Sequence, residues 1–257
     1  MATYLLKKSY QHKDLKEVNF KSLWDTHGIF TTMWIFNRPN KILFFKQHIK
    51  NLIKSLKFYN IKKTNLEKNI IKLIKLNLKK NKSYNHLLRV AVNKKLISIS
   101  IRKKLKIKKK FNIKLVNCKR YNPEFKNLKY KVILKHLSKI DTKKTDIGIC
   151  SNNHILESGT ANILFVQNNK IYSPNNNFYK GITLKFFEKK IRKIIKKKIS
   201  IKSLSLYEEI ILIGTGKGVV SVDNIKEYNW TRKSSKIYSY LLKIYQEAVK
   251  NCPRYNS

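Results

Sequence analysis

The spacing of hydrophobic residues in the first half of the chain predicts a sheet with helices. Apolar residues that recur every three or four positions predict one helix over residues 46–58 and another over 65–80. Short runs rich in β-branched and aromatic residues predict strands, because these side chains suit a pleated sheet. The predicted strands cover residues 27–36, 42–45, 87–92, 96–101 and 112–118. This half is therefore predicted to form a small α/β domain.

The second half predicts a mixed sheet with helices. The predicted strands cover residues 146–150, 154–157, 162–167, 170–173 and 209–213, and the predicted helices cover 128–139, 182–197 and 231–250. The pair Asn168–Asn169 between two of these strands is a hairpin signal. We expect an α+β fold with a small N-terminal α/β domain (1–118), an interdomain segment (119–125) and a larger C-terminal mixed-sheet domain (126–257).

The composition is that of a globular protein. Hydrophobic residues make up 42% of the 257 residues, which is enough to bury a core. No run of about 18 or more apolar residues occurs, so we expect no membrane-spanning helix, and the N-terminus lacks the apolar stretch of a secretory signal. The cysteines Cys118, Cys150 and Cys252 form neither a metal pattern nor a disulfide framework. We therefore predict a cytoplasmic protein without a metal site.

The net charge of +44 is of a size that normally suggests nucleic acid as partner. Nearly all of the basic residues are lysines, however, and they are spread along the whole chain among many asparagines and isoleucines. Codons rich in A and T encode these three residues, so an AT-rich genome explains the composition. We expect no nucleic-acid partner, and a basic nucleic-acid-binding protein is kept as the alternative from another functional class.

Two segments carry the main candidate chemistry. In RYNPEFKNLKY, an arginine-asparagine-proline region precedes a lysine, and in HILESGTANILFV a glutamate stands five residues before an asparagine. Together with HGIFTTMWIF, YKGITLKFF and GTGKG, these segments resemble the class IV aminotransferases over residues 28–222. The resemblance implies the two-domain fold type IV, pyridoxal 5'-phosphate as cofactor, and a homodimer with the active site between the domains.

Lys126 matches the lysine that holds the cofactor in this family. The resemblance implies that Lys126 forms the Schiff base with pyridoxal phosphate and later carries a proton between the amino acid's α-carbon and the cofactor's C4′. Lysine suits both tasks, because burial lowers the pKa of its ammonium and gives a nucleophilic amine near neutral pH. Lys129 and Lys131 are rival candidates. Tyr130 matches the tyrosine that contacts the cofactor's phenolic oxygen in branched-chain enzymes.

Glu157 matches the family's glutamate, which bonds the pyridine nitrogen of the cofactor. A carboxylate at this atom keeps the nitrogen protonated, so the ring can withdraw electrons from the substrate's α-carbon. The chain has only 14 acidic residues, and one of them falls at the position where the family needs an acid. The alternative is a carboxylate on a surface hairpin.

Two further segments match the phosphate-binding part of the family. The amides of Ile182 and Thr183 follow Gly181 at a predicted helix N-terminus, where a phosphate dianion is favoured. Thr215, in the loop GTGKG, matches the threonine that bonds the phosphate, and the amide of Gly216 is expected to face the substrate carboxylate. Taken alone, the first segment is an ordinary helix cap and the second an ordinary glycine loop. The loop is too short for a P-loop.

The resemblance fails at three places. Asn51 stands where the family has the helix arginine that binds the cofactor phosphate, so a bidentate charged contact becomes at best one neutral hydrogen bond. Lys50 or Lys54 could restore the charge. Leu184 stands where an arginine often follows the threonine, and the family's N-terminal pattern is reduced to WDTHG. An inactive remnant of the family is therefore one alternative.

The predicted activity is transamination between a branched-chain amino acid and 2-oxoglutarate. Gly214–Thr215 and Tyr130 favour it. The first alternative is aminodeoxychorismate lyase, which forms 4-aminobenzoate, because Phe30-Thr31-Thr32 resembles the lyase's strand. The second is a D-amino-acid aminotransferase. All three activities use the lysine and the glutamate, and all imply an amino acid or 2-oxo acid as the small-molecule partner.

Overall fold

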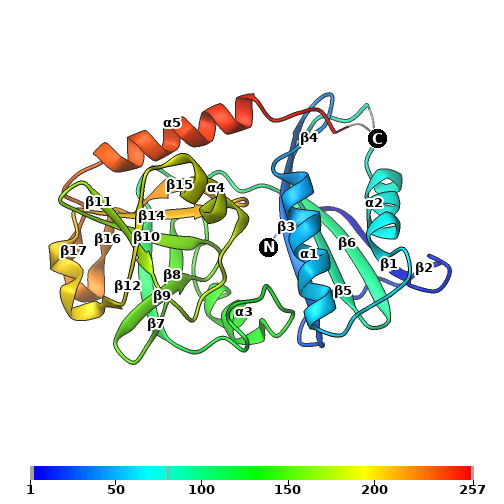
Figure 1. The fold of residues 1–257 in the computed structure, drawn as a ribbon, viewed down its shortest axis with the longest axis horizontal. Helices are drawn as coiled ribbons and strands as arrows, with labels where there is room; N and C mark the ends of the chain where they lie inside the picture. The colour runs from blue at the N-terminus through cyan, green and yellow to red at the C-terminus, as the bar shows by residue number, and fades with distance from the viewer. Residues whose placement is uncertain (1–2, 80, 256–257) are drawn as a thin grey trace. The chain divides into compact units, whose positions relative to one another are not determined.

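The computed structural model describes residues 3–79 and 81–255, and the chain forms two compact units (Figure 1). Unit 1 contains residues 1–104, 125–130 and 251–257, and unit 2 contains residues 105–124 and 131–250. None of the helices in the described part of the chain is both long and apolar enough to cross a membrane.

Unit 1 is built on an antiparallel sheet of six strands in the order β2-β1-β6-β5-β3-β4. The strands are β1 (Tyr4–Gln11), β2 (Glu17–Val18), β3 (Gly28–Asn37), β4 (Lys41–Ile42), β5 (Tyr84–Asn93) and β6 (Leu96–Lys103). Two helices, α1 (Phe45–Phe58) and α2 (Leu66–Asn77), bury their apolar side chains in the same core as the sheet. The helices were predicted because Leu52, Leu56, Ile70 and Leu73 recur at helical spacing, and all four are buried.

Both faces of this sheet carry buried side chains. Ile29 and Met33 of β3 lie in the core shared with α1 and α2. Phe30 belongs to a second, smaller cluster with Ala91 and Leu128. Because successive side chains of a strand point to opposite faces, the two clusters lie on opposite sides of the sheet. The smaller cluster includes Leu128, so it fixes the segment that follows Lys126.

Unit 2 contains two sheets with mixed strand directions. The five-stranded sheet has the order β12-β11-β10-β14-β15, and the six-stranded sheet has the order β13-β9-β8-β7-β16-β17. The strands are β7 (Asn112–Asn117), β8 (Thr145–Ser151), β9 (His154–Ser158), β10 (Asn162–Gln167), β11 (Lys170–Pro174), β12 (Ile194–Lys197), β13 (Ile199–Ser200), β14 (Glu209–Gly214), β15 (Gly218–Ser221), β16 (Asn224–Ile225) and β17 (Trp230–Thr231). Apolar side chains of both sheets form one core.

Three α-helices and two short 3-10 helices complete unit 2. They are α3 (Lys131–Leu137), α4 (Ile182–Lys190), α5 (Lys236–Lys250), η1 (Ile201–Leu206) and η2 (Lys226–Tyr228). The α+β class and the mixed sheets are confirmed. Residues 105–118, which were predicted to belong to the small domain, lie in unit 2, because β7 pairs in parallel with β8.

Several predictions of single elements were wrong. The helix predicted over 182–197 ends at Lys190, and residues 194–197 form β12, which pairs in parallel with β11. The β-branched isoleucines and consecutive lysines of this segment disfavour a helix, whereas pairing with β11 satisfies the backbone N–H and C=O groups of the segment. Only Lys41–Ile42 of the predicted strand 42–45 is a strand, since Phe44 adopts a left-handed conformation (φ 56°) and starts α1. The strand β1 was not predicted.

The tight hairpins of unit 2 turn on pairs of asparagines. Asn168 and Asn169 have φ values of 51° and 58° and join β10 to β11. Asn152 and Asn153, with φ values of 49° and 59°, join β8 to β9 in the same way. Positive φ at both central residues matches the twist of the flanking strands, and asparagine tolerates it better than most residues. The predicted hairpin at Asn168–Asn169 is therefore confirmed.

Candidate active site

The backbone of Lys126 is fixed by pairing with β3. The amide of Phe30 donates to the carbonyl of Lys126 at 2.9 Å, and the amide of Leu128 donates to the carbonyl of Gly28 at 2.9 Å. The approach is so close that a Cβ atom on Gly28 would stand 2.7 Å from the Leu128 side chain and 2.3 Å from the carbonyl oxygen of Val92. Glycine at position 28 therefore allows the segment of Lys126 to lie against the sheet.

The side chain of Lys126 lies beside an aromatic ring and a buried histidine. Its Nζ is 5.1 Å from the ring centroid of Phe30. Nδ1 of His48, on α1, is 2.8 Å from Oγ1 of Thr31 on β3. Burial, and to a smaller extent the positive charge of Lys126, lowers the pKa of His48 to about 3. A neutral imidazole therefore stands near Lys126 over the whole physiological pH range.

The rival lysine of this segment lies in a different environment. Nζ of Lys129 is 3.7 Å from Oδ1 of Asp25, and the two side chains are 45% and 52% exposed. An exposed ion pair of this kind contributes little free energy. The ring of Tyr130 packs against the rings of Trp24 and Phe30, with distances of 5.8 Å and 5.5 Å between the ring centroids. Among these residues, Lys126 has the surroundings that best suit a reactive amine.

Glu157, in unit 2, is buried and fully engaged. Its Oε1 accepts a hydrogen bond of 2.6 Å from Nε of Arg120, and the two side chains are 7% and 3% exposed. Oε2 accepts from the amide of Tyr179 at 3.3 Å. Arg120 also donates to the carbonyl of Pro123, which anchors its guanidinium. Burial raises the pKa of Tyr179 to about 12, so its ring stays neutral beside the ion pair. The position of Glu157 is inconsistent with the alternative of a surface carboxylate.

A bulge in β9 lies directly before Glu157. Ile149 of β8 pairs with Glu157, but the next residue, Cys150, pairs with Ile155, so Leu156 is an extra residue on β9. A bulge changes the direction in which neighbouring side chains leave the strand and is common next to active sites. Here it sets the orientation of the candidate carboxylate.

The asparagine of the same motif ties β10 to the start of α4. Nδ2 of Asn162 donates to the carbonyl of Tyr179 at 2.6 Å, and its Oδ1 accepts from the amide of Gly181 at 2.9 Å. Glu157 accepts from the amide of Tyr179, so both motif residues hold the same three-residue segment. A Cβ atom on Gly181 would stand 2.7 Å from Oδ1 of Asn162, which explains the glycine. The spacing of five residues between glutamate and asparagine thus has a structural reason.

The structure brings the predicted phosphate residues together. Thr183, in the first turn of α4, and Thr215, in the turn between β14 and β15, are both buried, and their Oγ1 atoms are 3.3 Å apart. The N-cap residue of α4, Gly181, has no side chain that could cap the first turn. The first-turn amides of α4 and the two threonine hydroxyls form a set of donors that fits a phosphate group. Ile182 and Gly216 adjoin this set in sequence.

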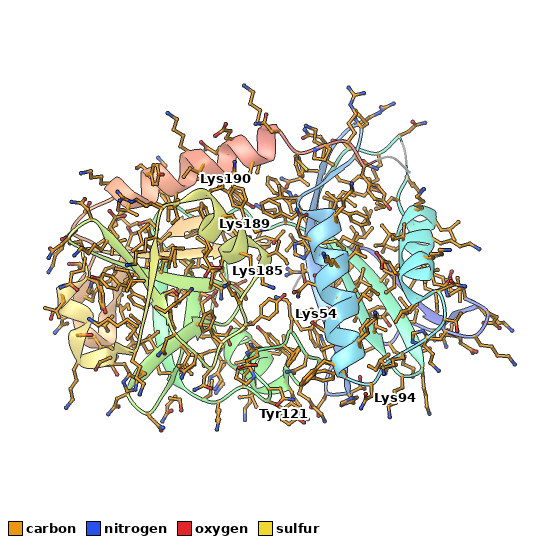
Figure 2. All side chains as sticks on the ribbon, viewed as in Figure 1. Lys54, Lys94, Tyr121, Lys185, Lys189 and Lys190 are labelled. Atoms are coloured by element: carbon orange, nitrogen blue, oxygen red, sulfur yellow. The ribbon has the colours of Figure 1, made fainter. Side chains whose placement is uncertain are left out.

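Asn51, on α1, is half-buried and its carbonyl accepts a hydrogen bond of 2.8 Å from Oγ of Ser55. Lys50 and Lys54 of the same helix are exposed, and Figure 2 marks Lys54 on α1. Lys185, Lys189 and Lys190 project from α4 in the same figure. Cationic side chains thus occur on both helices that bear predicted phosphate positions, although neither helix has the family's arginine there.

Of the predicted site residues, Lys126 and Tyr130 belong to unit 1, and Glu157, Ile182, Thr183, Thr215 and Gly216 belong to unit 2. Arg120, the arginine of RYNPEF, was not predicted to have a role in the site. The sequence contained a signal for Arg120, because nearly all other basic residues are lysines and this arginine stands in a motif that resembles the family. Across residues 3–79 and 81–255, no three His, Cys, Asp or Glu side chains are grouped so as to hold a metal ion.

The comparisons with known proteins identify the family of the chain. The family model "Amino-transferase class IV" matches residues 28–225, which is most of the chain. The chain belongs to the class IV aminotransferases. It is therefore a pyridoxal-phosphate-dependent enzyme, and the predicted family, cofactor and enzyme class are confirmed. No curated protein matches the sequence.

Several solved structures share the fold. The branched-chain aminotransferase of the archaeon Thermoproteus uzoniensis, solved with norvaline, is 14% identical, with a TM-score of 0.77 and coverage of 95% of each chain. A putative branched-chain aminotransferase of Thermotoga maritima is 16% identical, with a TM-score of 0.76 and coverage of 95% of this chain and 96% of that one. A putative 4-amino-4-deoxychorismate lyase of Legionella pneumophila is 19% identical, with a TM-score of 0.67 and coverage of 86% and 91%.

Proposed function

We propose that this class IV aminotransferase transfers the amino group between a branched-chain amino acid and 2-oxoglutarate, with Lys126 as the reactive lysine. The pairing of Thr183 with Thr215 at the start of α4 carries this proposal, because it forms a phosphate-binding set from two segments that are far apart in sequence. Solved structures with this fold include a branched-chain enzyme solved with norvaline, an unbranched amino acid. Gly214–Thr215 favours branched-chain substrates.

Pyridoxal phosphate, when bound, supplies an electron-withdrawing ring that stabilises negative charge at the substrate's α-carbon. Glu157 would hold the ring nitrogen, and Arg120 keeps the carboxylate of Glu157 oriented. The hydroxyls of Thr183 and Thr215 and the first-turn amides of α4 would bind the phosphate. Lys126 Nζ removes the proton from the α-carbon of the amino acid. The neutral His48 near Lys126 adds no positive charge, and the aromatic ring of Phe30 excludes water on one side.

The experiment that tests the reactive lysine uses cofactor-loaded protein that is reduced with borohydride and digested. Mass spectrometry should find the pyridoxyl group on Lys126, and Lys126→Ala should lose both the label and the transamination of leucine. Lys129→Ala is the matched control, because it removes the neighbouring exposed lysine and should keep both. A label on Lys129, or full activity of Lys126→Ala, contradicts the proposal.

The second candidate is aminodeoxychorismate lyase. It is favoured by Thr31 of the Phe-Thr-Thr strand, whose hydroxyl is paired with His48. The fold is also that of a putative lyase of Legionella. Product analysis with leucine plus 2-oxoglutarate, with D-alanine plus 2-oxoglutarate and with aminodeoxychorismate separates the two candidates and the D-amino-acid enzyme. Formation of 4-aminobenzoate without amino transfer overturns the transaminase proposal.

A further inference from the structure

Asp146 is a buried carboxylate that the proposed chemistry does not use. It lies on β8 with 0% of its surface exposed. Its Oδ1 accepts from the amide of Ile147 at 2.8 Å, and its Oδ2 accepts from the hydroxyls of Ser158 at 3.1 Å and Thr160 at 2.7 Å. Burying a carboxylate is costly unless its oxygens are well paired, so a residue with this many partners needs an explanation.

The charge partner of Asp146 is Lys217, whose side chain is only 8% exposed. Nζ of Lys217 is 3.4 Å from Oδ2 of Asp146 and 4.5 Å from the ring centroid of Phe111, which is fully buried. Most lysines are solvated, and a lysine that is taken out of water loses hydration unless an anion and a polarisable ring replace it. Lys217 therefore holds a specific place in the interior of unit 2.

The pair joins two turns that both carry candidate site residues. Lys217 belongs to the turn between β14 and β15, directly after Thr215 and Gly216. Ser158 ends β9 directly after Glu157, and Thr160 lies in the turn between β9 and β10. Asp146 thus bonds the turn that follows the candidate ring-nitrogen ligand and, through Lys217, the turn that holds a candidate phosphate ligand.

The first of these turns packs directly on Asp146. A Cβ atom on Gly159 would stand 3.1 Å from Oδ1 of Asp146 and 2.6 Å from the side chain of Ile147. The amide of Gly159 also donates to the carbonyl of Ile147 at 2.8 Å. The turn therefore has no room for a side chain at this position, and its distance from Asp146 is fixed by backbone contact.

We propose that Asp146 and Lys217 are a pair of positioning residues that sets the spacing between Glu157 and Thr215. The inference rests on the proposed function, because it assigns the two turns to opposite ends of the same cofactor. Neither residue contacts the reacting atoms. Their role is to keep the phosphate-binding hydroxyl at a constant distance from the carboxylate that holds the ring, and a small shift of a binding group is enough to cost affinity.

The first test needs no cofactor. Amide hydrogen exchange is compared in the wild-type protein, Lys217→Met and Asp146→Asn, with Lys226→Met on η2 as an exposed control. Both pair variants should exchange about tenfold faster in the turn residues 159–161 and 215–217, while the strands β10 and β14 keep their protection. Lys217→Arg should keep slow exchange in both turns. Faster exchange in 215–217 alone, or an equal rise throughout unit 2, overturns the proposal.

The second test separates positioning from general stability. Affinities of the apo protein for pyridoxal phosphate and for pyridoxal, which lacks the phosphate, are measured for the same variants. Lys217→Met should weaken the binding of pyridoxal phosphate about tenfold or more. It should weaken the binding of pyridoxal less than about twofold, because only pyridoxal phosphate spans both turns. An equal loss for both compounds overturns the proposal. If Lys217→Met does not fold, Lys217→Gln takes its place in both tests.

A wild-type protein that binds no pyridoxal phosphate contradicts the proposed function, not the coupling of the two turns. The exchange experiment still decides that coupling, because it is made on the apo protein. If the pair variants exchange faster in both turns but the protein does not bind pyridoxal phosphate, the proposed function is rejected and the link between the turns is retained. The two failures are distinguishable.

Discussion

In unit 2 the candidate site residues are held by side-chain hydrogen bonds, whereas in unit 1 Lys126 is held by backbone pairing and apolar packing. Glu157 accepts from Arg120, Asn162 bonds the segment before α4, and Thr183 pairs with Thr215. The segment of Lys126 instead pairs through its backbone with β3, and Leu128 anchors it in a cluster of apolar side chains.

The difference explains where the chain departs from its family. A polar network accepts few substitutions, because each replaced residue leaves a buried donor or acceptor without its partner. Apolar packing accepts any side chain of suitable size, so the contacts of unit 1 put less restriction on residue type. Asn51 and the segment WDTHG, two of the three departures, lie in unit 1. The motifs HILESGTAN and KGIT, which resemble those of the family, lie in unit 2.

The largest effect on activity is expected at Glu157, the residue of the polar network that is proposed to hold the cofactor's ring nitrogen. Glu157→Gln should lower the rate of transamination about a hundred- to a thousandfold, because the neutral amide no longer stabilises positive charge on the ring nitrogen. The rate is measured by single-turnover absorbance in cofactor-loaded protein. Glu124→Gln, an exposed glutamate of the same unit, is the control and should keep the wild-type rate. An active Glu157→Gln would mean that another residue holds the ring nitrogen.

A second effect tests the histidine next to Lys126 in unit 1. The folded pKa of His48 is about 3, whereas the unfolded value is near 6.5. The unfolded chain therefore binds the proton more readily, so this stability is fully present above about pH 6.5 and is lost as pH falls toward 3. Between pH 7 and pH 5 the loss amounts to about 2 kcal/mol of unfolding free energy.

Urea unfolding at the two pH values measures this loss, and His48→Gln should remove it. His136→Gln, on α3, provides the control for replacing a histidine elsewhere. The comparison uses the difference between pH 7 and pH 5, so a constant destabilisation of the variant cancels. Equal pH dependence in wild-type protein and His48→Gln would show that His48 is not buried in its neutral form.

The smallest effect is expected from repairing the departure in unit 1. Asn51→Arg should tighten the binding of pyridoxal phosphate about five- to tenfold, because a charged donor replaces a neutral one. Fluorescence titration of the apo protein measures the affinity. Gln47→Arg adds the same charge at an exposed position of α1 and should leave the affinity unchanged. A similar gain from both variants would reveal a general effect of charge.

The sequence predicted most strands and helices of both units, because their apolar residues follow clear periods. It missed β1, whose lysines and mostly exposed side chains hide the strand pattern. It extended α4 to residue 197, because Ile194 and Ile195 fit a helical period as well as a strand. Tertiary pairing with β11 decided between the two, and no local pattern contains that information.

The candidate site was predicted through its motifs, but the partners within it were not. Nothing in the spacing of Arg120 and Glu157 indicates an ion pair, because the two residues are 37 positions apart and the chain between them passes through a helix and two strands. The coupling of Asp146 to Lys217 spans an even longer stretch of chain. Pairings of this kind depend on sheet topology, which the sequence predicted only as a class.

The asparagine turns affect how strongly the amino-acid composition of this chain can change without loss of the fold. Fourteen non-glycine residues in the described part of the chain have positive φ, and ten of them are asparagines, whereas the sequence has only 7 glycines. Asparagine is the residue that best replaces glycine in a left-handed conformation. A mutational pressure that depletes glycine and enriches asparagine therefore leaves the hairpins intact, and the architecture tolerates a bias that would otherwise erode its tightest bends.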